Sequence, residues 1–309
     1  MRVALIGPGT VSVVHLAAIE KLGADLVGVC DSSRDHRAFL DEVRPDVVHV
    51  CTPHDRHVRI ATDALERGVH VLLEKPVAHT IEQAELLVAA AEDHPQVKIG
   101  VCLQNRYNLT TRAARDLLAS GELGRVIGGS ATVLWHRDAG YYKARPWRSV
   151  RERAGGGVLI NQAIHTLDLL QWLAGEVTSM SGHAGRYGGL PGDVEDTAHL
   201  VLDHAGGARS VFFATVTNAT DAPVTIEIVA ERGSLLIRGD LSVAYADGRV
   251  ETIAELAPDG GGRSYWGASH ELLIADFYRS LPDPEPFWIG PREALGAQRL
   301  IDEIYRTTS

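Results

Sequence analysis

Lys75 is the residue of this chain whose type and position most directly suggest chemistry. It stands in the tripeptide Glu74-Lys75-Pro76, directly after the apolar run 69–73, which reads as a buried strand. Proline cannot continue a strand ladder, and a lysine at the end of such a strand must be solvated, paired or used. Farther along the chain, a predicted helix carries Asn161 and His165 one turn apart. A lysine and a histidine can exchange the proton that accompanies hydride transfer to or from an alcohol.

A glycine turn near the start of the chain predicts a dinucleotide site. Gly7-Pro8-Gly9-Thr10-Val11-Ser12 follows a predicted strand and precedes a predicted helix. In such turns the first glycine permits the tight bend and the second lets the backbone approach a pyrophosphate, although similar turns also occur without ligands. Asp31 ends the second strand, where a carboxylate accepts hydrogen bonds from a ribose 2′-hydroxyl, so NAD is favoured. NADP stays open because Ser32, Ser33 and Arg34 could receive a 2′-phosphate.

Several motifs in order along the chain resemble the Gfo/Idh/MocA oxidoreductase family. They are Gly7-x-Gly9, Thr52-Pro53 with His57, Glu74-Lys75-Pro76, Gly155-Gly156-Gly157 and Asn161-x-x-x-His165-x-x-Asp168. Members of this family are sugar and polyol dehydrogenases and reductases that use NAD or NADP. The resemblance implies that Lys75 reaches the substrate hydroxyl or carbonyl, with its proline peptide in cis, and that His165 is its acid/base partner. Position 161 is often aspartate in the family, and Asn161 can orient a substrate but cannot accept a proton.

The predicted site residues form three groups. The predicted catalytic residues are Lys75, His165 and Asn161. The predicted cofactor contacts are Gly7, Pro8, Gly9, Thr10, Val11, Asp31, Ser32, Arg34, Thr52, Pro53, His54, His57, Glu74, Lys75 and Gln104. The predicted substrate contacts are Arg106, Tyr142, Trp147, Arg148, Asn161 and His165. Aromatic faces with nearby cations suit sugar binding, but the stretch before the site helix could also be a dimer contact or a mobile loop. The polar stripe that includes Asp168 could also be a satisfied seam in a core, and Asp168 itself is expected to be structural.

The sequence predicts an α/β protein with two domains. In residues 1–122, short apolar runs alternate with helical patterns, which is typical of a parallel Rossmann sheet. Residues 123–309 are predicted to form an α+β domain for substrate binding and oligomerisation, with a mainly antiparallel, open-faced sheet. The stretch between Asp31 and Asp46 has room for one short helix. We therefore expect the outer strand of the dinucleotide sheet to be missing, the Asp31 strand to lie at the edge, and the adenosine pocket to be exposed.

Composition narrows the classes of partner and compartment. The net charge of −10 argues against nucleic acid, and no apolar run is long enough for a membrane helix. The N-terminus enters a strand at once, which leaves no room for a signal peptide. The three cysteines fall in predicted strands without zinc-ligand spacing, and the 14 histidines include no metal motif, so we expect reduced thiols, a cytoplasmic protein and no metal. A homodimer or homotetramer through the C-terminal sheet is expected from the resemblance.

Three functions compete on this evidence. The first is an NAD(P)-dependent oxidoreductase acting on a secondary alcohol or ketone of a carbohydrate or polyol: a sugar, sugar derivative or cyclitol. The second is a non-enzymatic cofactor-binding regulator or scaffold on the same fold. The third is an NAD-dependent glycoside-cleaving enzyme that uses transient oxidation and shows no net NADH. Retention of Lys75 and His165 favours an enzyme over a regulator.

Overall fold

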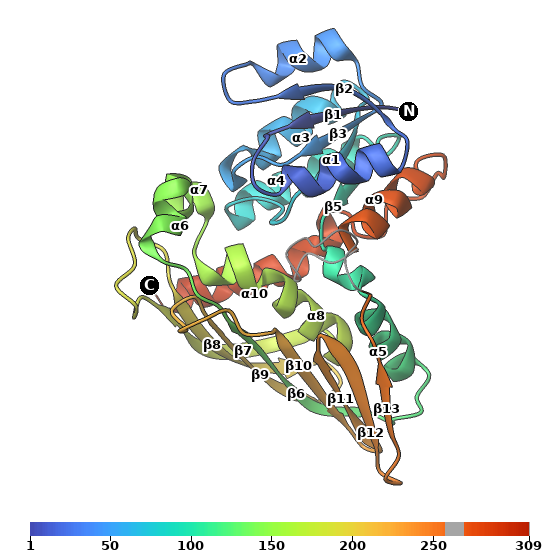
Figure 1. Ribbon diagram of the computed structural model, residues 1–309, viewed down its shortest axis with the longest axis vertical. Coiled ribbons are helices and arrows are strands. Elements are labelled where there is room, and N and C mark those ends of the chain that lie inside the picture. The colour runs from blue at the N-terminus through green and yellow to red at the C-terminus, as the bar shows by residue number, and fades with distance from the viewer. Residues whose placement is uncertain (257–268, 309) are drawn as a thin grey trace. The chain divides into compact units, whose positions relative to one another are not determined.

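The structure is a computed structural model that describes residues 1–256 and 269–308 (Figure 1). Its first sheet is wholly parallel and has the strand order β2-β1-β3-β4-β5. The strands are β1 (Arg2–Ile6), β2 (Asp25–Cys30), β3 (Val47–Val50), β4 (His70–Leu73) and β5 (Ile99–Val101). The interiors of β1, β3, β4 and β5 are mostly apolar and buried on both sides, as parallel sheets require, whereas β2 exposes Leu26 and Val29. This confirms the predicted Rossmann-type sheet.

Helices follow each of the first four strands. They are α1 (Ser12–Lys21), α2 (His36–Val43), α3 (His57–Leu65) after the short turn η1 (His54–Arg56), and α4 (Ile81–Asp93). The carboxylate of Asp35 accepts a hydrogen bond from the amide of Ala38 at 3.0 Å and so caps α2, while Thr80 caps α4 through the amide of Gln83. α2, α3 and α4 pack side by side, and α1 packs against the later helix α9 (Ser269–Ser280), as Figure 1 shows.

The short stretch after Asp31 has the predicted consequence. Only α2 lies between β2 and β3, and β2 forms the edge of the sheet in the described part of the chain. The prediction that the outer strand is missing is therefore confirmed. Each added parallel strand needs a crossover of a dozen or more residues. The stretch between β2 and β3 is long enough for the single crossover through α2 and too short for a second one.

The second sheet has eight strands in the order β13-β12-β11-β10-β6-β9-β8-β7. They are β6 (Val126–Leu134), β7 (Val177–Gly185), β8 (Thr197–His204), β9 (Arg209–Thr215), β10 (Thr225–Ala230), β11 (Gly233–Arg238), β12 (Asp240–Tyr245) and β13 (Val250–Ile253). All pairs are antiparallel except β6 with β9. The strands β11 and β12 follow one another directly, because Gly239 turns the chain with a φ of +74°. The strand β13 is absent from the sequence prediction.

One face of this sheet is covered and the other is open. α8 (Ile164–Ala174) packs on β6 and β10, and Figure 1 shows it lying along the sheet. The opposite face carries exposed apolar side chains from the three strands β9, β10 and β11: Val211, Phe213, Val229 and Leu236. We call these four residues the open face. The expected open-faced sheet is therefore confirmed.

Close contacts divide the chain into two units. The first unit comprises Met1–Gln104, α9 and the chain up to Gln298, and the second comprises the chain from Asn105 through β13 and from Arg299 onward. The two units share α10 (Pro291–Thr308). The expected boundary at residue 122 lies inside the second unit, because α5 (Leu109–Ala119), which follows the turn η2 (Gln104–Tyr107), packs on α8 and on β11 and β12. None of the described helices is long and apolar enough to cross a membrane.

Candidate active site

The turn between β1 and α1 has the features of a dinucleotide-binding loop. Gly7 has a φ of +95°, and a Cβ atom there would lie 2.8 Å from the backbone of Cys51 and Thr52. Only glycine can therefore make this contact with the end of β3. The Ser12 hydroxyl donates to the Gly9 carbonyl at 2.8 Å and holds the loop against the start of α1, whose amide groups can bind a pyrophosphate. The other predicted loop residues are exposed or half-buried: Pro8, Thr10 and Val11.

The end of β2 carries an ionised carboxylate next to cationic side chains. Asp31 is exposed, and its Oδ1 accepts hydrogen bonds from the backbone N–H and the hydroxyl of Ser33, at 2.8 and 2.6 Å. These bonds hold the pKa of Asp31 below its usual range. A cavity of about 380 Å³ is lined in part by Ser32, Arg34 and Arg56. Asp31 suits a ribose 2′-hydroxyl and repels phosphate, whereas the guanidinium groups attract phosphate.

The end of β3 contributes a buried hydroxyl that a ligand could satisfy. Thr52 Oγ1 is buried and has no hydrogen-bond partner within the described residues. His57 bridges two strand ends, with Nδ1 2.8 Å from the Pro76 carbonyl oxygen and Nε2 3.0 Å from that of Thr52. Burial lowers the pKa of His57, and the two carbonyl oxygens oppose that shift. Because an unpartnered buried hydroxyl is costly, Thr52 fits a site that a bound cofactor completes. The same loop contains Pro53 and a buried His54.

Lys75 lies at the carboxyl end of β4. Its side chain is half-buried, and its bond to Pro76 is cis, which confirms the conformation implied by the resemblance. Glu74 is buried, and its Oε1 lies 2.9 Å from Nε2 of His15. Gln104 is buried in η2, directly after the strand β5. The carboxyl ends of parallel strands lie at the same end of the sheet. Four features therefore follow neighbouring strand ends: the glycine turn, the loop after β3, Lys75 and Gln104.

Asn161 and His165 lie on one helical segment of the second unit. Asn161 belongs to η4 (Leu159–Ala163), a turn of π-helix, and His165 is the second residue of α8. The sequence predicted a single α-helix over 158–174, and π-helical turns often mark functional sites. Both side chains are half-buried, while most of the surrounding apolar residues are buried. The Asn161 amide and the His165 imidazole are therefore partly accessible on a segment whose apolar side chains are mostly buried.

Glu195 fixes the beginning of this segment, a role that the sequence analysis missed. Its carboxylate accepts hydrogen bonds from the amides of Gly157 at 2.7 Å and Leu159 at 3.0 Å and from the Tyr305 hydroxyl at 2.6 Å. A Cβ atom at Gly157 would lie 1.8 Å from the Glu195 carbonyl oxygen, and one at Gly156 would lie 2.1 Å from the Tyr305 hydroxyl. Gly156 and Gly157 of the three-glycine motif are thus explained by close packing against Tyr305 and against the backbone of Glu195. The only signal in the sequence was an acidic pair at the start of a predicted strand.

Arg106 is part of a buried ion pair. Its Nε and Nη2 donate to the two carboxylate oxygens of Asp168 at 2.8 and 2.7 Å, and both side chains are almost fully buried. The guanidinium also lies 5.4 Å from the ring centre of Trp172. A bidentate pair of this kind joins η2 to α8. It supports the structural role expected for Asp168 and favours the same role for Arg106, which the sequence analysis proposed as a substrate contact.

The stretch before the site segment gathers aromatic rings and cations. It folds into α6 (Ala139–Ala144), η3 (Pro146–Ser149) and α7 (Arg151–Ala154). Arg148 lies 4.3 Å from the ring centre of Tyr141, whose hydroxyl accepts a hydrogen bond from Gln162 at 3.1 Å. Tyr142 is buried, and burial raises its pKa to about 12, so its hydroxyl stays protonated at neutral pH. Trp147 is half-buried in the same group, which is therefore attached to the segment that carries Asn161.

Two family descriptions match the chain. "Oxidoreductase family, NAD-binding Rossmann fold" matches residues 1–101, and "GFO/IDH/MocA C-terminal domain" matches residues 111–236. The first match lies within the first unit and the second within the second unit.

The chain is also similar to characterised proteins. It is 28% identical to a levoglucosan dehydrogenase of Pseudarthrobacter phenanthrenivorans over 72% of this chain and 64% of the relative. It is 33% identical to a D-glucoside 3-dehydrogenase of Escherichia coli over 60% of this chain and 57% of the relative. The matched region thus spans less than two thirds of either relative. The structure resembles the WlbA dehydrogenase of Bordetella pertussis, solved with NADH and UDP-GlcNAcA, with a TM-score of 0.82 and 27% identity over 99% of this chain and 95% of that one.

Proposed function

The chain belongs to the Gfo/Idh/MocA family of NAD-binding oxidoreductases, and from this premise we propose that it interconverts a secondary alcohol and a ketone on a sugar, sugar derivative or cyclitol. The observation that carries the proposal is the position of Lys75. Lys75 follows β4 at the same end of the sheet as the glycine turn, and both lie within the residues that match the NAD-binding description. NAD, when bound, supplies the hydride acceptor or, when reduced, the donor.

The residues along this edge fit NAD. The backbone around Gly7 and Gly9 and the start of α1 would bind the pyrophosphate, and Asp31 would accept a hydrogen bond from a ribose hydroxyl. Thr52 Oγ1, buried and unpartnered among the described residues, would gain a partner. Pro53, His54 and Gln104 would contact the cofactor from neighbouring loops, and Arg34 would lie beside the adenosine end. The edge position of β2 supports an exposed adenosine pocket and looser binding than a sheet with an outer strand would give.

Lys75 and His165 would carry the proton. Oxidation requires a base that takes the hydroxyl proton, and reduction requires an acid that returns it. We assign this exchange at the reacting oxygen to Lys75, because its half-buried side chain follows β4 at the end of the sheet where the glycine turn lies. The imidazole of His165 can donate or accept a proton, and it would hydrogen-bond the same oxygen or relay the proton. Asn161 cannot accept a proton, so its amide would orient the substrate.

The relatives support a carbohydrate substrate. Their names specify levoglucosan, a D-glucoside, 1,5-anhydro-D-fructose and inositol as compounds on which they act. The aromatic and cationic group around Tyr142, Trp147 and Arg148 would form one wall of the substrate site, because aromatic faces pack on sugar rings. Tyr142, with its raised pKa, would donate a hydrogen bond there and would not act as a base.

The open face supports self-association. Val211, Phe213, Val229 and Leu236 are each at least 39% exposed on strands of one sheet, and apolar patches of this kind mark interfaces. We assign this face to a homodimer or homotetramer contact. The Val211→Asp substitution should shift the mass measured by light scattering to that of a monomer, and an unchanged mass would exclude this face. The cytoplasm is the compartment we assign, because Cys30, Cys51 and Cys102 are free thiols.

A hydride screen followed by product mass spectrometry tests the function. The protein is incubated with NAD or NADP and with D-glucosides, 1,5-anhydro sugars, inositols and nucleotide sugars. We expect NADH to accumulate with one class, together with a product that has lost two hydrogen atoms. Silence with every substrate at saturating cofactor would favour the regulator. Product formation without net NADH would favour transient oxidation, as in glycoside cleavage.

A further inference from the structure

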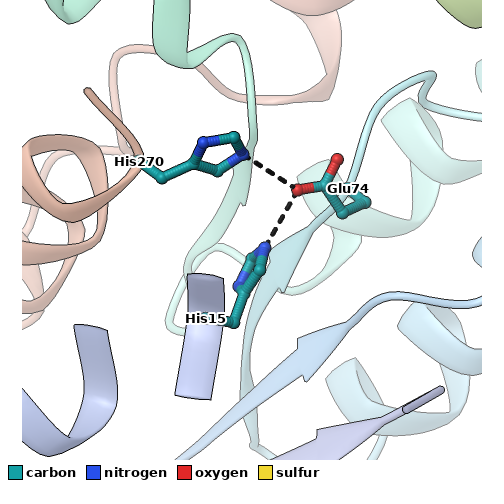
Figure 2. A group of neighbouring side chains, drawn as sticks. All are labelled: His15, Glu74 and His270. Atoms are coloured by element: carbon teal, nitrogen blue, oxygen red, sulfur yellow. Dashed lines mark hydrogen bonds and ion pairs between the residues drawn. The ribbon is translucent and has the colours of Figure 1, made fainter. Parts of the chain in front are cut away.

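Three buried side chains from distant parts of the first unit converge on one point (Figure 2). His15 comes from α1, Glu74 follows β4, and His270 comes from α9. Oε1 of Glu74 lies 2.9 Å from Nε2 of His15 and 3.5 Å from Nε2 of His270. One ligating atom from each residue lies within 4.8 Å of the others, and all three residues are at most 6% exposed. The sequence analysis, which sought closely spaced metal motifs, could not find a group whose members are this far apart along the chain.

Hydrogen bonds within the described residues satisfy His15 but not His270. Neither ring nitrogen of His270 has a hydrogen-bond partner there, although the side chain is buried. The 3.5 Å separation from Glu74 is beyond the usual length of an N–H···O bond. Buried polar nitrogens normally have partners, so an imidazole held in this way calls for another one. A partner that bonds to both His270 Nε2 and Glu74 Oε1 would have to lie between these two atoms.

The surroundings of His15 have the form expected behind a metal ligand. Its Nδ1 lies 2.9 Å from Nδ1 of His49, whose Nε2 lies 2.8 Å from the Tyr278 hydroxyl. If the Nε2 lone pair of His15 faces a cation, Nδ1 carries the proton and donates to His49. His49 then donates from Nε2 to Tyr278, and every ring nitrogen is used with both imidazoles neutral. Metal-bound histidines typically donate their other N–H in this way.

We propose that His15, Glu74 and His270 bind one divalent transition-metal ion, with zinc the best fit to two imidazoles and a carboxylate. Zinc bonds to these atoms of about 2.0–2.2 Å place tetrahedral neighbours roughly 3.3 Å apart. The observed separations of 2.9 and 3.5 Å bracket that value. Water would complete the fourth position. The ion would fasten α9 to α1 and to the end of β4, and its role would be structural, separate from the proton transfer proposed above.

The test is zinc stoichiometry and affinity on the full chain. Protein stripped with a chelator is titrated with zinc against a competing dye, and its melting temperature is measured with and without zinc. We expect one zinc per chain and a higher melting temperature. His270→Ala should weaken binding by about a hundredfold or more, since even outer-shell changes cost about 10–100-fold. In chelator it should melt below the wild type, because a buried ring that pairs with Glu74 is removed, so the readout is the zinc-dependent rise in melting temperature, which His270→Ala should lose.

A matched variant separates this site from adventitious binding. His183 and His199 stack on neighbouring strands of the second unit with ring centres 6.4 Å apart, and such a pair can collect zinc. His183→Ala should leave the stoichiometric site intact. The proposal would be overturned by binding well below one ion per chain, by loss of binding in His183→Ala, or by unchanged binding in His270→Ala. His15, Glu74 and His270 would then be a group joined by protons and not by a metal ion. If His270→Ala does not fold, the wild-type stoichiometry and the His183→Ala result still decide. NAD binding by stripped protein is a separate readout of the proposed function.

Discussion

Each unit has a buried glutamate near its candidate proton-transfer residue, and the two carboxylates differ in their partners. Glu74 directly precedes Lys75, and its nearest partners are the imidazoles of His15 and His270. Glu195 lies at the start of the segment that carries His165, and it accepts hydrogen bonds from two backbone amides and from Tyr305. The first arrangement pairs a carboxylate with two imidazoles. The second pairs it with three neutral hydrogen-bond donors and, at 3.7 Å, with the Arg151 guanidinium.

The pKa directions of the two carboxyls follow from that difference. Burial raises the pKa of each, and this is the largest single influence on both. Near Glu74 the two histidines outweigh burial, so its pKa is well below the usual range. Near Glu195 the neutral donors do not outweigh burial, so its pKa is raised. The pKa of Glu195, which holds a helix start through neutral donors, is therefore raised. The pKa of Glu74, the neighbour of Lys75, is lowered by its two imidazole partners.

The largest effect should come from Lys75 itself. Lys75→Met removes the proton carrier but leaves the glycine turn, so kcat should fall by about a thousandfold, within the range for losing general acid–base catalysis. NAD affinity, measured by fluorescence titration, should stay close to that of the wild type. The exposed Lys21, which pairs with Glu271, provides the control variant Lys21→Met. A Lys75→Met enzyme with kcat within about tenfold of the wild type would contradict the assignment.

Removing the Glu195 carboxylate should have the next largest effect. Glu195→Ala leaves three buried donors without an acceptor, at about 1–3 kcal/mol each, so the free energy of unfolding should drop by roughly 3 kcal/mol or more. Denaturant titration measures this, and kcat should fall as His165 loses its support. Glu152→Ala, at an exposed position, is the control. Wild-type stability in Glu195→Ala would show that the contacts to Gly157 and Leu159 do not matter.

The pH dependence of the Glu195 contribution should be smaller but of definite sign. Its folded-state pKa lies above the unfolded value, so the folded protein binds the proton more tightly between the two values. Its contribution to stability is therefore fully present below the unfolded pKa and falls as pH rises through the folded pKa. The destabilisation caused by Glu195→Gln, measured by denaturant titration at several pH values, should be larger near pH 5 than near pH 8. A larger effect at high pH would indicate that Glu195 has a lowered pKa like Glu74.

The smallest effect should concern the choice of cofactor. Asp31→Ala removes the charge that repels a 2′-phosphate and leaves Arg34 and Arg56 at the cavity. The ratio of kcat/KM for NADP to that for NAD should rise by about tenfold, which corresponds to about 1.4 kcal/mol. Ser33→Ala keeps the carboxylate and should change the ratio less. An unchanged ratio in Asp31→Ala would mean that β2, at the sheet edge, does not select the cofactor.

The sequence predicted the elements of the first unit well because their signals are local. Periodic apolar runs, Gly7 and the Glu74-Lys75-Pro76 motif all lie within short stretches, and the missing outer strand follows from chain length alone. The supports of the site depend on contacts between distant residues. Glu195 meets Gly157 across 38 positions of sequence and Tyr305 across 110, and Arg106 meets Asp168 across 62, so these contacts were not predicted. The π-helical turn at Asn161 likewise depends on how the helix start is held.

The most direct test of the central claim follows the hydride itself. A substrate deuterated at the carbon that bears the reacting hydroxyl is incubated with the protein and NAD, and the mass of the cofactor is then measured. Our account predicts reduced cofactor about one mass unit heavier than that formed from undeuterated substrate, because the deuterium moves to the nicotinamide ring. Product formation with no deuterium in the cofactor would contradict the account.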